Sequence, residues 1–208
     1  RVTALLAARD GRLYVGTQRG LGVLREGRWR ILTQADGLAD DSVNVLFGDA
    51  QGGVWVGASG APRGGLTWLG LQGEIRIFNT TNGLPHNMVN ALAQEAGGAI
   101  WVGTGFLERG GAARLEYRQG TWSVVRSLTA KDGLAGAKVR SVFVDSGGAV
   151  WFGSEYDGVA HLAGGRWSLI TSRDGLSHQE VMAMAQGPDG TMWLGTRDGL
   201  NRVAPGGL

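Results

Sequence analysis

The stretch "VNVLFGDAQGGVW" at residues 43–55 consists of an apolar run, a glycine-rich turn and a tryptophan at its end. The same pattern recurs four more times, at residues 2–14, 89–101, 139–151 and 181–193. In every copy a glycine stands three residues before the closing aromatic residue, and another stands two residues after it. One repeated unit therefore decides the fold of the whole chain.

A second motif separates the copies. The stretches "DGLADDSV", "NGLPHNMV", "DGLAGAKV" and "DGLSHQEV" each place a Gly-Leu pair just ahead of the valine that opens the next copy. The repeat length is about 45 residues, which is the size of a blade-like β unit. We expect a single domain over residues 1–208, with repeats at 2–42, 43–88, 89–138, 139–180 and 181–208.

Each copy is typical of four short strands, because frequent glycines and β-branched residues disfavour a helix. In the second strand Val54 and Val56 flank Trp55, so both faces of the strand are apolar and both must be covered. Radially stacked sheets meet that condition. The sequence therefore predicts an all-β fold, a β-propeller with five repeats, in which the last blade is incomplete because the fifth copy stops before its fourth strand.

The closing aromatic residues are expected to form the core between blades, since large rings are usually buried. Residues i and i+2 of a strand share a face, so the indole of one blade is expected to settle over the glycine of its neighbour. The residues assigned to this core are Tyr14, Trp55, Trp101, Trp151 and Trp193. A second set at the start of the fourth strands is also interpreted as packing: Trp29, Ile75, Trp122 and Trp167.

Composition excludes several classes of protein. Twenty basic against eighteen acidic side chains leave a formal charge of +2 with no dense Lys/Arg cluster, so nucleic acid is not expected as a partner. The chain has no cysteine, which excludes disulfides and thiolate metal sites. We expect no metal and no cofactor, because the spacing of ligand residues matches no metal motif. No apolar run approaches the roughly 20 residues that span a bilayer, so no membrane segment is expected in this chain.

The repeat also resembles a known family. A Gly-Leu pair, a polar loop, a valine, an apolar strand and then Gly, Trp, an aliphatic residue and Gly-Thr follow the two-component regulator propeller repeat. The stretch "NGLPHNMVNALAQEAGGAIWVGT" at residues 82–104 is close to the full pattern, and the resemblance covers essentially the whole chain. It implies an extracytoplasmic ligand-binding input domain of a sensor histidine kinase, periplasmic or secreted, of a kind that often responds to carbohydrates.

The number of blades in the ring stays open at this point. Three arrangements fit the repeats: a closed five-blade ring with one three-stranded blade, a piece of a larger ring, and two chains that complete one ring. An incomplete terminal blade exposes apolar faces and strand edges, which favours self-association.

A ligand is expected on the face where the loops between second and third strands meet the loops that lead into each first strand. The gap from Gly57 to Gly65 and from Gly103 to Gly111 is eight residues, against four or five in the other blades, so these loops are elaborated for binding. The candidate ligand-binding residues are Arg19, Arg63, His86, Phe106, Glu108, Arg109, Tyr156, Asp157, His178, Arg197 and Asp198. Polar residues of the adjoining loops join them: Asp40, Asp41, Asn87, Lys138, Gln179 and Glu180.

Mixed charge with aromatic groups suits a small polar ligand, such as an oligosaccharide, and favours a non-catalytic sensor domain. Two other functions remain open, a scaffold that binds proteins through the loop face and a lyase-type propeller enzyme. A pocket of small-molecule size favours the sensor, and a flat apolar loop face favours the scaffold. Two titratable groups within hydrogen-bond reach at the channel mouth would favour the enzyme. No catalytic residue is assigned.

Overall fold

The computed structural model describes residues 1–60 and 63–206 of the chain. Two parts of the sequence-based expectations lie outside these ranges: residues 61 and 62 of the long loop after Gly57, and residues 207 and 208 at the end of the fifth repeat. Within the described ranges no helix is long and apolar enough to cross a membrane.

The described strands form five antiparallel sheets, each with its strands in sequence order. Blade one contains β1 (Val2–Ala7), β2 (Leu13–Thr17), β3 (Gly20–Arg25) and β4 (Arg28–Leu32). Blade two contains β5 (Val43–Gly48), β6 (Val54–Ala58), β7 (Leu66–Leu69) and β8 (Ile75–Phe78). Blade three contains β9 (Val89–Gln94), β10 (Ile100–Phe106), β11 (Arg109–Arg118) and β12 (Thr121–Leu128).

Blade four contains β13 (Val139–Val144), β14 (Val150–Ser154), β15 (Val159–Ala163) and β16 (Arg166–Ile170). Blade five has three strands, β17 (Val181–Gln186), β18 (Met192–Thr196) and β19 (Gly199–Val203). The predicted all-β propeller fold with five repeats and an incomplete last blade is confirmed.

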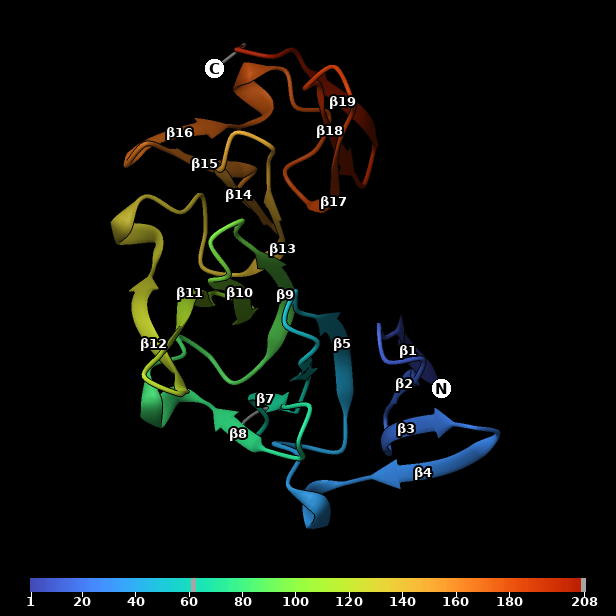
Figure 1. Ribbon diagram of the computed structural model, residues 1–208. Coiled ribbons are helices and arrows are strands. Elements are labelled where there is room, and N and C mark those ends of the chain that lie inside the picture. The colour runs from blue at the N-terminus through green and yellow to red at the C-terminus, as the bar shows by residue number, and fades with distance from the viewer. Residues whose placement is uncertain (61–62, 207–208) are drawn as a thin grey trace.

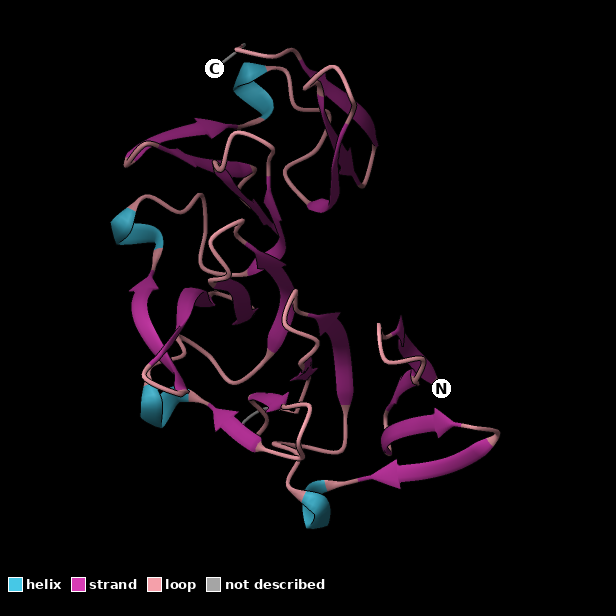
Figure 2. Ribbon diagram, viewed as in Figure 1, coloured by secondary structure: helices cyan, strands magenta, loops and turns pink. Residues whose placement is uncertain are grey.

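The Gly-Leu motifs form the turns between blades. Short 3-10 turns at Gln34–Asp36, Thr80–Asn82, Ala130–Asp132 and Ser172–Asp174 each begin with a capping box. Each ends at a glycine in the left-handed backbone conformation, for example Gly83 with φ of 112°. Residues other than glycine rarely adopt this conformation. Figure 2 shows these turns in cyan along the outer side of the arc of blades.

In blades one to four the closing aromatic residue packs against the next blade. Trp55 of blade two makes an edge contact with Trp122 of blade three, with ring centroids 4.8 Å apart, and belongs to a core cluster that also contains Ile100. Trp101 packs in the same way against Phe152 of blade four at 5.2 Å. Tyr14, Trp55, Trp101 and Trp151 are all buried, as predicted.

The glycine that follows each of these aromatic residues has a different neighbour from the one predicted. A side chain at Gly57 would meet Val89, the first residue of β9, at 2.6 Å, and one at Gly103 would meet Val139 of β13 at 2.7 Å. The prediction that an indole covers the glycine is therefore wrong. The hollow left by the glycine is filled by the first valine of the next inner strand, because that strand passes closer to the glycine than the bulky ring can.

Hydrogen bonds join the same inner strands. Thr3 donates to the carbonyl of Val43 at 2.7 Å, Asn44 to that of Val89 at 2.8 Å, and Asn90 to that of Val139 at 3.0 Å. Each side chain lies one residue after the opening valine of its own blade. The valine contact and the hydrogen bond recur together, so successive blades meet at one repeated geometry.

The blades form an open arc. β1, β5, β9, β13 and β17 pack in succession, but β17 does not pack against β1, and Figure 1 shows blades one and five apart at the two ends of the arc. The closed five-blade ring is therefore wrong, because four steps of the repeated interface do not bring blade five back to blade one.

Two aromatic predictions fail for the same reason. Trp193 is exposed, although its equivalents in the other blades are buried, because no described blade follows blade five. Trp29 is also exposed, whereas its counterpart Trp122 is buried, because no described blade precedes blade one. Ile75 is exposed as well, although it contacts the turn at Gly37.

Candidate functional site

Two kinds of loop meet on one face of the arc. The loop after each second strand bonds to the segment that leads into the first strand of the same or the next blade: Gly105 N–H donates to Met88 O at 2.9 Å, and Glu155 N–H to Lys138 O at 3.2 Å. Arg197 N–H donates to Glu180 O at 3.3 Å in blade five. The prediction that these loops share a face is confirmed.

The long loop of blade three is an extended hairpin. β10 and β11 stay paired up to Phe106 and Arg109, so only Leu107 and Glu108 form the turn. Leu107 has φ of 51°, a left-handed conformation that is uncommon for a branched apolar residue. Phe106, at the end of this hairpin, is 46% exposed.

A pocket of about 940 Å³ lies beneath this hairpin, between blades three and four. Of the predicted ligand-binding residues, it gathers His86, Phe106, Glu108, Arg109, Tyr156 and Asp157. Leu107, Ala130, Ala135, Gly136, Ala137 and Lys138 complete the lining. Six of the eleven predicted ligand-binding residues therefore line one hollow of small-molecule size, and their role in binding stays a prediction.

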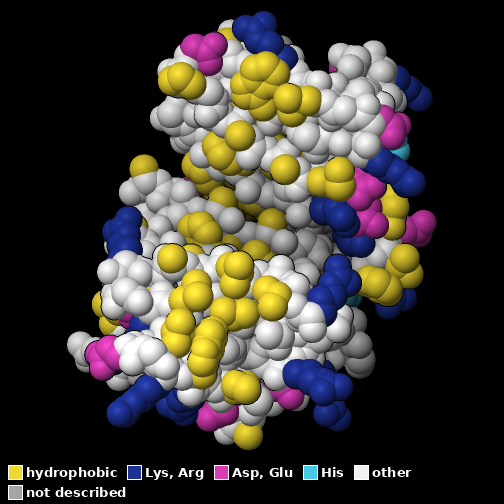
Figure 3. All heavy atoms as spheres, turned by 90° about the vertical axis from the view of Figure 1, so that its right-hand side faces the viewer, with side chains coloured by type: hydrophobic (Ala, Val, Ile, Leu, Met, Phe, Trp, Pro, Cys, Tyr) yellow, Lys and Arg dark blue, Asp and Glu magenta, His cyan; other side chains and the backbone are white. Residues whose placement is uncertain are grey.

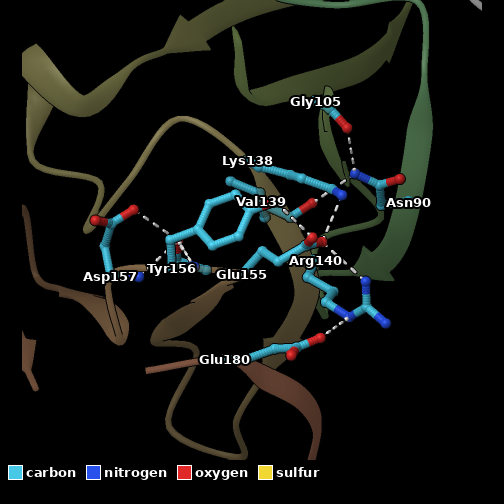
Figure 4. Close-up of polar contacts among 10 residues, drawn as sticks. Asn90, Gly105, Lys138, Val139, Arg140, Glu155, Tyr156, Asp157 and Glu180 are labelled. Atoms are coloured by element: carbon cyan, nitrogen blue, oxygen red, sulfur yellow. Dashed lines mark hydrogen bonds and ion pairs between the residues drawn. The ribbon is translucent and has the colours of Figure 1, made fainter. Parts of the chain in front are cut away.

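Lys138, which lines the pocket, forms a largely buried ion pair with Glu155. Lys138 Nζ lies 2.5 Å from Glu155 Oε2 and 5.9 Å from the centre of the Phe106 ring. The same carboxylate oxygen accepts from Arg140 Nη1 at 2.9 Å. In Figure 4, Arg140 of β13 and Lys138, the residue just before β13, both point toward Glu155.

The network continues into blade five and back into blade three. Arg140 Nε lies 3.2 Å from Glu180 Oε1, so Arg140 bridges two carboxylates. On the other side, Asn90 Nδ2 donates to the carbonyls of Gly105 and Val139, both at 3.0 Å. The segment around Lys138 is therefore held by contacts from three blades, which limits how far it can move.

The protonation states of Glu155 and Tyr156 follow from their contacts. Burial opposes ionisation of Glu155, but the hydrogen bonds from Lys138 and Tyr156 outweigh it and lower the pKa of the carboxyl group. Tyr156 donates its hydroxyl to Glu155 Oε1 at 2.8 Å, and this bond raises the pKa of the phenol. Glu155 is thus an ionised counter-ion at neutral pH, and a poor proton acceptor.

His86 is held as a neutral imidazole. Its Nδ1 accepts from the amide of Met88 at 2.9 Å, which places the proton on Nε2. Burial and then the charge of Arg109 lower the pKa of His86. His178 makes the equivalent bond, from the amide of Glu180 at 2.9 Å, but does not line the pocket.

Several predicted site residues lie away from the pocket. Arg19, Arg63, Arg197 and Asp198 are exposed on the loops of other blades. Asp41, Asn87 and Gln179 accept hydrogen bonds from the amides that open the inter-blade turns, at Gln34, Thr80 and Ser172. Asp40 accepts from the amide of Ser42. These acidic and amide groups shape the loops.

Carboxylates of the glycine turns are also structural. Asp49 accepts from the indoles of Trp55 at 2.9 Å and Trp68 at 3.1 Å, while its other oxygen accepts from the turn amide of Gly53. Asp145 does the same for Trp151 at 2.8 Å. Across residues 1–60 and 63–206, no group of three or more His, Asp or Glu side chains is arranged to hold a metal ion.

Sequence reasoning missed Glu155 and Arg140. Glu155 follows the Gly-Ser pair where the other blades have Gly-Thr or Gly-Ala, and Arg140 stands where blades two and three have Asn44 and Asn90. At both positions the residue differs from its counterparts in the other copies, and this difference was the sequence signal that could have pointed to them. The two charges compensate each other only because the fold brings the loop and strand together.

Residues 175–198, which span the end of the fourth repeat and the first two strands of the fifth, match the family model described as two component regulator propeller. This segment is similar to the two-component regulator propeller repeat. The other four copies hold the same glycine and aromatic positions in the same register. The family resemblance of the repeat is confirmed. No curated protein sequence matches the chain at a significant level.

Solved structures share the fold of this propeller repeat protein. The extracellular domain of BT4673 from B. thetaiotaomicron, described as a hybrid two component system, superposes with a TM-score of 0.78 at 14% identity over 99% of this chain. Virginiamycin B lyase from Staphylococcus aureus gives 0.73 at 14% identity over 100% of this chain and 68% of its own. PorZ of the Porphyromonas gingivalis type-IX secretion system gives 0.69 at 15% identity, covering 96% of this chain and 31% of its own. The chain spans 30% of the length of the BT4673 domain.

Proposed function

We propose that this propeller is an extracytoplasmic ligand-sensing domain and that the pocket between blades three and four binds an oligosaccharide or a related polar ligand. The observation that carries the proposal is the pair of rings at the pocket, Phe106 and Tyr156, which are 46% and 49% exposed. An exposed aromatic face beside charged groups suits the apolar face and the hydroxyls of a sugar.

The polar groups of the pocket complement such a ligand. Arg109 offers a planar donor, and Glu108 and Asp157 offer acceptors, and all three line the same hollow. Asp157 is oriented by the buried hydroxyl of Ser154, whose Oγ lies 3.1 Å from its carboxylate. The solved structures of similar fold include extracellular domains of two-component systems, which supports the extracytoplasmic sensor without identifying its ligand.

A lyase is the second candidate, because virginiamycin B lyase shares the fold and because Lys138, Glu155 and Tyr156 are titratable groups within hydrogen-bond reach at the loop face. Their arrangement opposes general base catalysis. Glu155 has a lowered pKa and Tyr156 a raised one, so neither exchanges a proton readily near neutral pH. The non-catalytic sensor therefore accounts better for the pocket.

Titration calorimetry against neutral and acidic oligosaccharides tests the proposal. We expect binding of one sugar class, weakened at least tenfold by Phe106→Ala and by Arg109→Ala. Arg197→Ala is the matched control, because Arg197 is an exposed arginine on the corresponding loop of blade five. Absence of binding to every class, or equal weakening by the control, would overturn the site, and conversion of a bound sugar or of a streptogramin would favour the enzyme.

A further inference from the structure

The interface between blades one and two is packed differently from the next two interfaces. Trp55 meets Trp122 across blades two and three, and Trp101 meets Phe152 across blades three and four. Between blades one and two the buried ring is Tyr14, and blade two contributes only aliphatic side chains to the cluster around it. A pocket of about 660 Å³ lies beside this cluster and is lined by both blades.

Blade two lacks an aromatic ring where blade four has one. Ile75 lies beside Gly37 of the preceding turn, as Trp167 lies beside Gly133 of the equivalent turn. Trp167 packs against the core cluster between blades three and four. Ile75 is smaller, is 40% exposed and lines the pocket. The hollow therefore includes space that an indole fills at the equivalent position, because well-packed interfaces leave few voids of this size.

Blade one also reverses the charge beside its buried ring. In blades two, three and four the indole donates to a carboxylate, at Asp49, Glu95 and Asp145. Ala8 occupies this position in blade one. Arg12 Nη1 instead donates to the Tyr14 hydroxyl at 3.4 Å. The other blades have small residues at the position of Arg12, namely Gly53, Ala99, Ala149 and Thr191. The ring that lies beside a negative charge in three blades thus lies beside a positive one in blade one.

Three more arginines face the same interface. Arg25 pairs with Arg28, and Val23 with Arg30, across β3 and β4, and paired residues share a face of the sheet. Val23 packs toward blade two, so these arginines face blade two as well. Trp29 lies between Arg28 and Arg30 on the opposite face, so the pocket does not depend on what covers that side. Figure 3 views the molecule from the side of blade one and shows Lys and Arg side chains along the edges of its lower part, around a hydrophobic surface.

The acidic groups near the pocket leave arginine donors available. Three of the arginines have an acidic neighbour within 3.4 Å: Asp10 for Arg12, Glu26 for Arg25 and Asp36 for Arg30. Across residues 1–60 and 63–206, Arg28 has no ion-pair partner. Glu74 also lines the pocket, and its carboxylate accepts from the amide of Gln72 at 3.0 Å. Exposed ion pairs contribute little energy in water, so an incoming anion can compete for these arginines.

We propose that the pocket between blades one and two is a second ligand site, which takes a small organic carboxylate with an apolar body. Arg28 binds the carboxylate together with Arg12 and Arg30, because a guanidinium presents two parallel N–H donors that match a carboxylate. Leu69 and Ile75 of blade two contact the apolar body. No residue lines both this pocket and the one between blades three and four, so the two sites are separate.

Titration calorimetry with three matched probes tests the ligand chemistry. Hydrocinnamate carries both a carboxylate and a ring, its amide keeps the ring without the charge, and propionate keeps the charge without the ring. We expect hydrocinnamate to bind at least about tenfold more tightly than either of the others, because hydrogen bonds to a charged group are the stronger ones. Equal binding of the amide, or no binding of hydrocinnamate, would overturn the proposal.

An arginine substitution tests the position of the charge. Arg28→Gln should weaken hydrocinnamate binding about tenfold. Arg166→Gln is the matched control and should leave the affinity unchanged, because Arg166 precedes Trp167 in blade four as Arg28 precedes Trp29 in blade one, is exposed and does not line the pocket. Equal weakening by the two variants would contradict the assignment of Arg28.

Filling the hollow tests the place of the apolar body. Ile75→Trp should abolish hydrocinnamate binding without lowering the thermal midpoint of the free chain, since Trp167 is accommodated beside the equivalent glycine. A folded Ile75→Trp that binds as the unmodified chain does would overturn the proposal. Loss of binding in Phe106→Ala would do so too, because it would assign hydrocinnamate to the pocket between blades three and four.

Discussion

Asp49 shows how much of each blade depends on one carboxylate. Its two oxygens satisfy the turn amide of Gly53 and the indole N–H groups of Trp55 and Trp68, and it is buried. Asparagine has one oxygen, so Asp49→Asn must leave either the turn or the indoles without an acceptor. We expect a loss of about 1–3 kcal/mol in unfolding free energy, measured by urea denaturation.

Asp189→Asn is the matched control for this substitution. Asp189 occupies the corresponding glycine turn of blade five, is exposed, and accepts only from Thr191. Its change should alter the unfolding free energy by less than about 0.5 kcal/mol. Equal losses for the two variants would show that the indole contacts of Asp49 contribute nothing.

Glu95 gives a second prediction at the residue scale. It accepts from Arg114 Nε at 2.8 Å and from Trp101 Nε1 at 2.6 Å, and the Arg114 bond, opposed by burial and aided by Trp101, lowers its pKa. Because the folded pKa lies below the ordinary value of 4.5, the folded state binds fewer protons than the unfolded state. The stabilisation is therefore present above about pH 4.5 and is lost as the pH falls through the folded pKa.

Thermal denaturation of Glu95→Gln across pH 3–7 checks this sign. We expect the unmodified chain to be the more stable at pH 7, and the difference between the two midpoints to shrink below about pH 4.5. A difference that stays constant with pH would mean that the charge of Glu95 is not what stabilises the contact.

At the scale of the element, strands and turns were predictable because every copy repeats its own glycines and apolar alternation. Exposure of Trp29 and Trp193 was not predictable, since their local pattern matches that of buried residues and only the missing neighbour differs. Phe106 and Tyr156 could be assigned to the loop face from loop length and type. The Lys138–Glu155 pair could not, because it forms only where the loop of blade four meets the segment before β13.

The glycine hollow supports a prediction about the interface between blades. In Gly57→Ala the new methyl group would lie 2.6 Å from Val89 and 2.5 Å from Val45, so blades two and three must separate slightly. We expect a loss of about 1–3 kcal/mol in unfolding free energy. Gly195→Ala is the control at the equivalent site of blade five, where the nearest atom is 3.5 Å away, and should be neutral in dilute solution.

For the whole molecule, the open arc predicts a gradient of local stability. Blades two, three and four each have two neighbours, whereas blades one and five have one, and blade five also lacks a fourth strand. In a repeat protein, stability is roughly the sum of each unit and its interfaces with adjacent units. Amides of β17–β19 should therefore exchange with solvent at least tenfold faster than those of β9–β11.

Hydrogen exchange with mass spectrometry on the chain in dilute solution measures this gradient. Both end blades should be weakly protected compared with blade three. Uniform protection along the monomer would show that the five blades open as one unit, with no separate contribution from the interfaces between them.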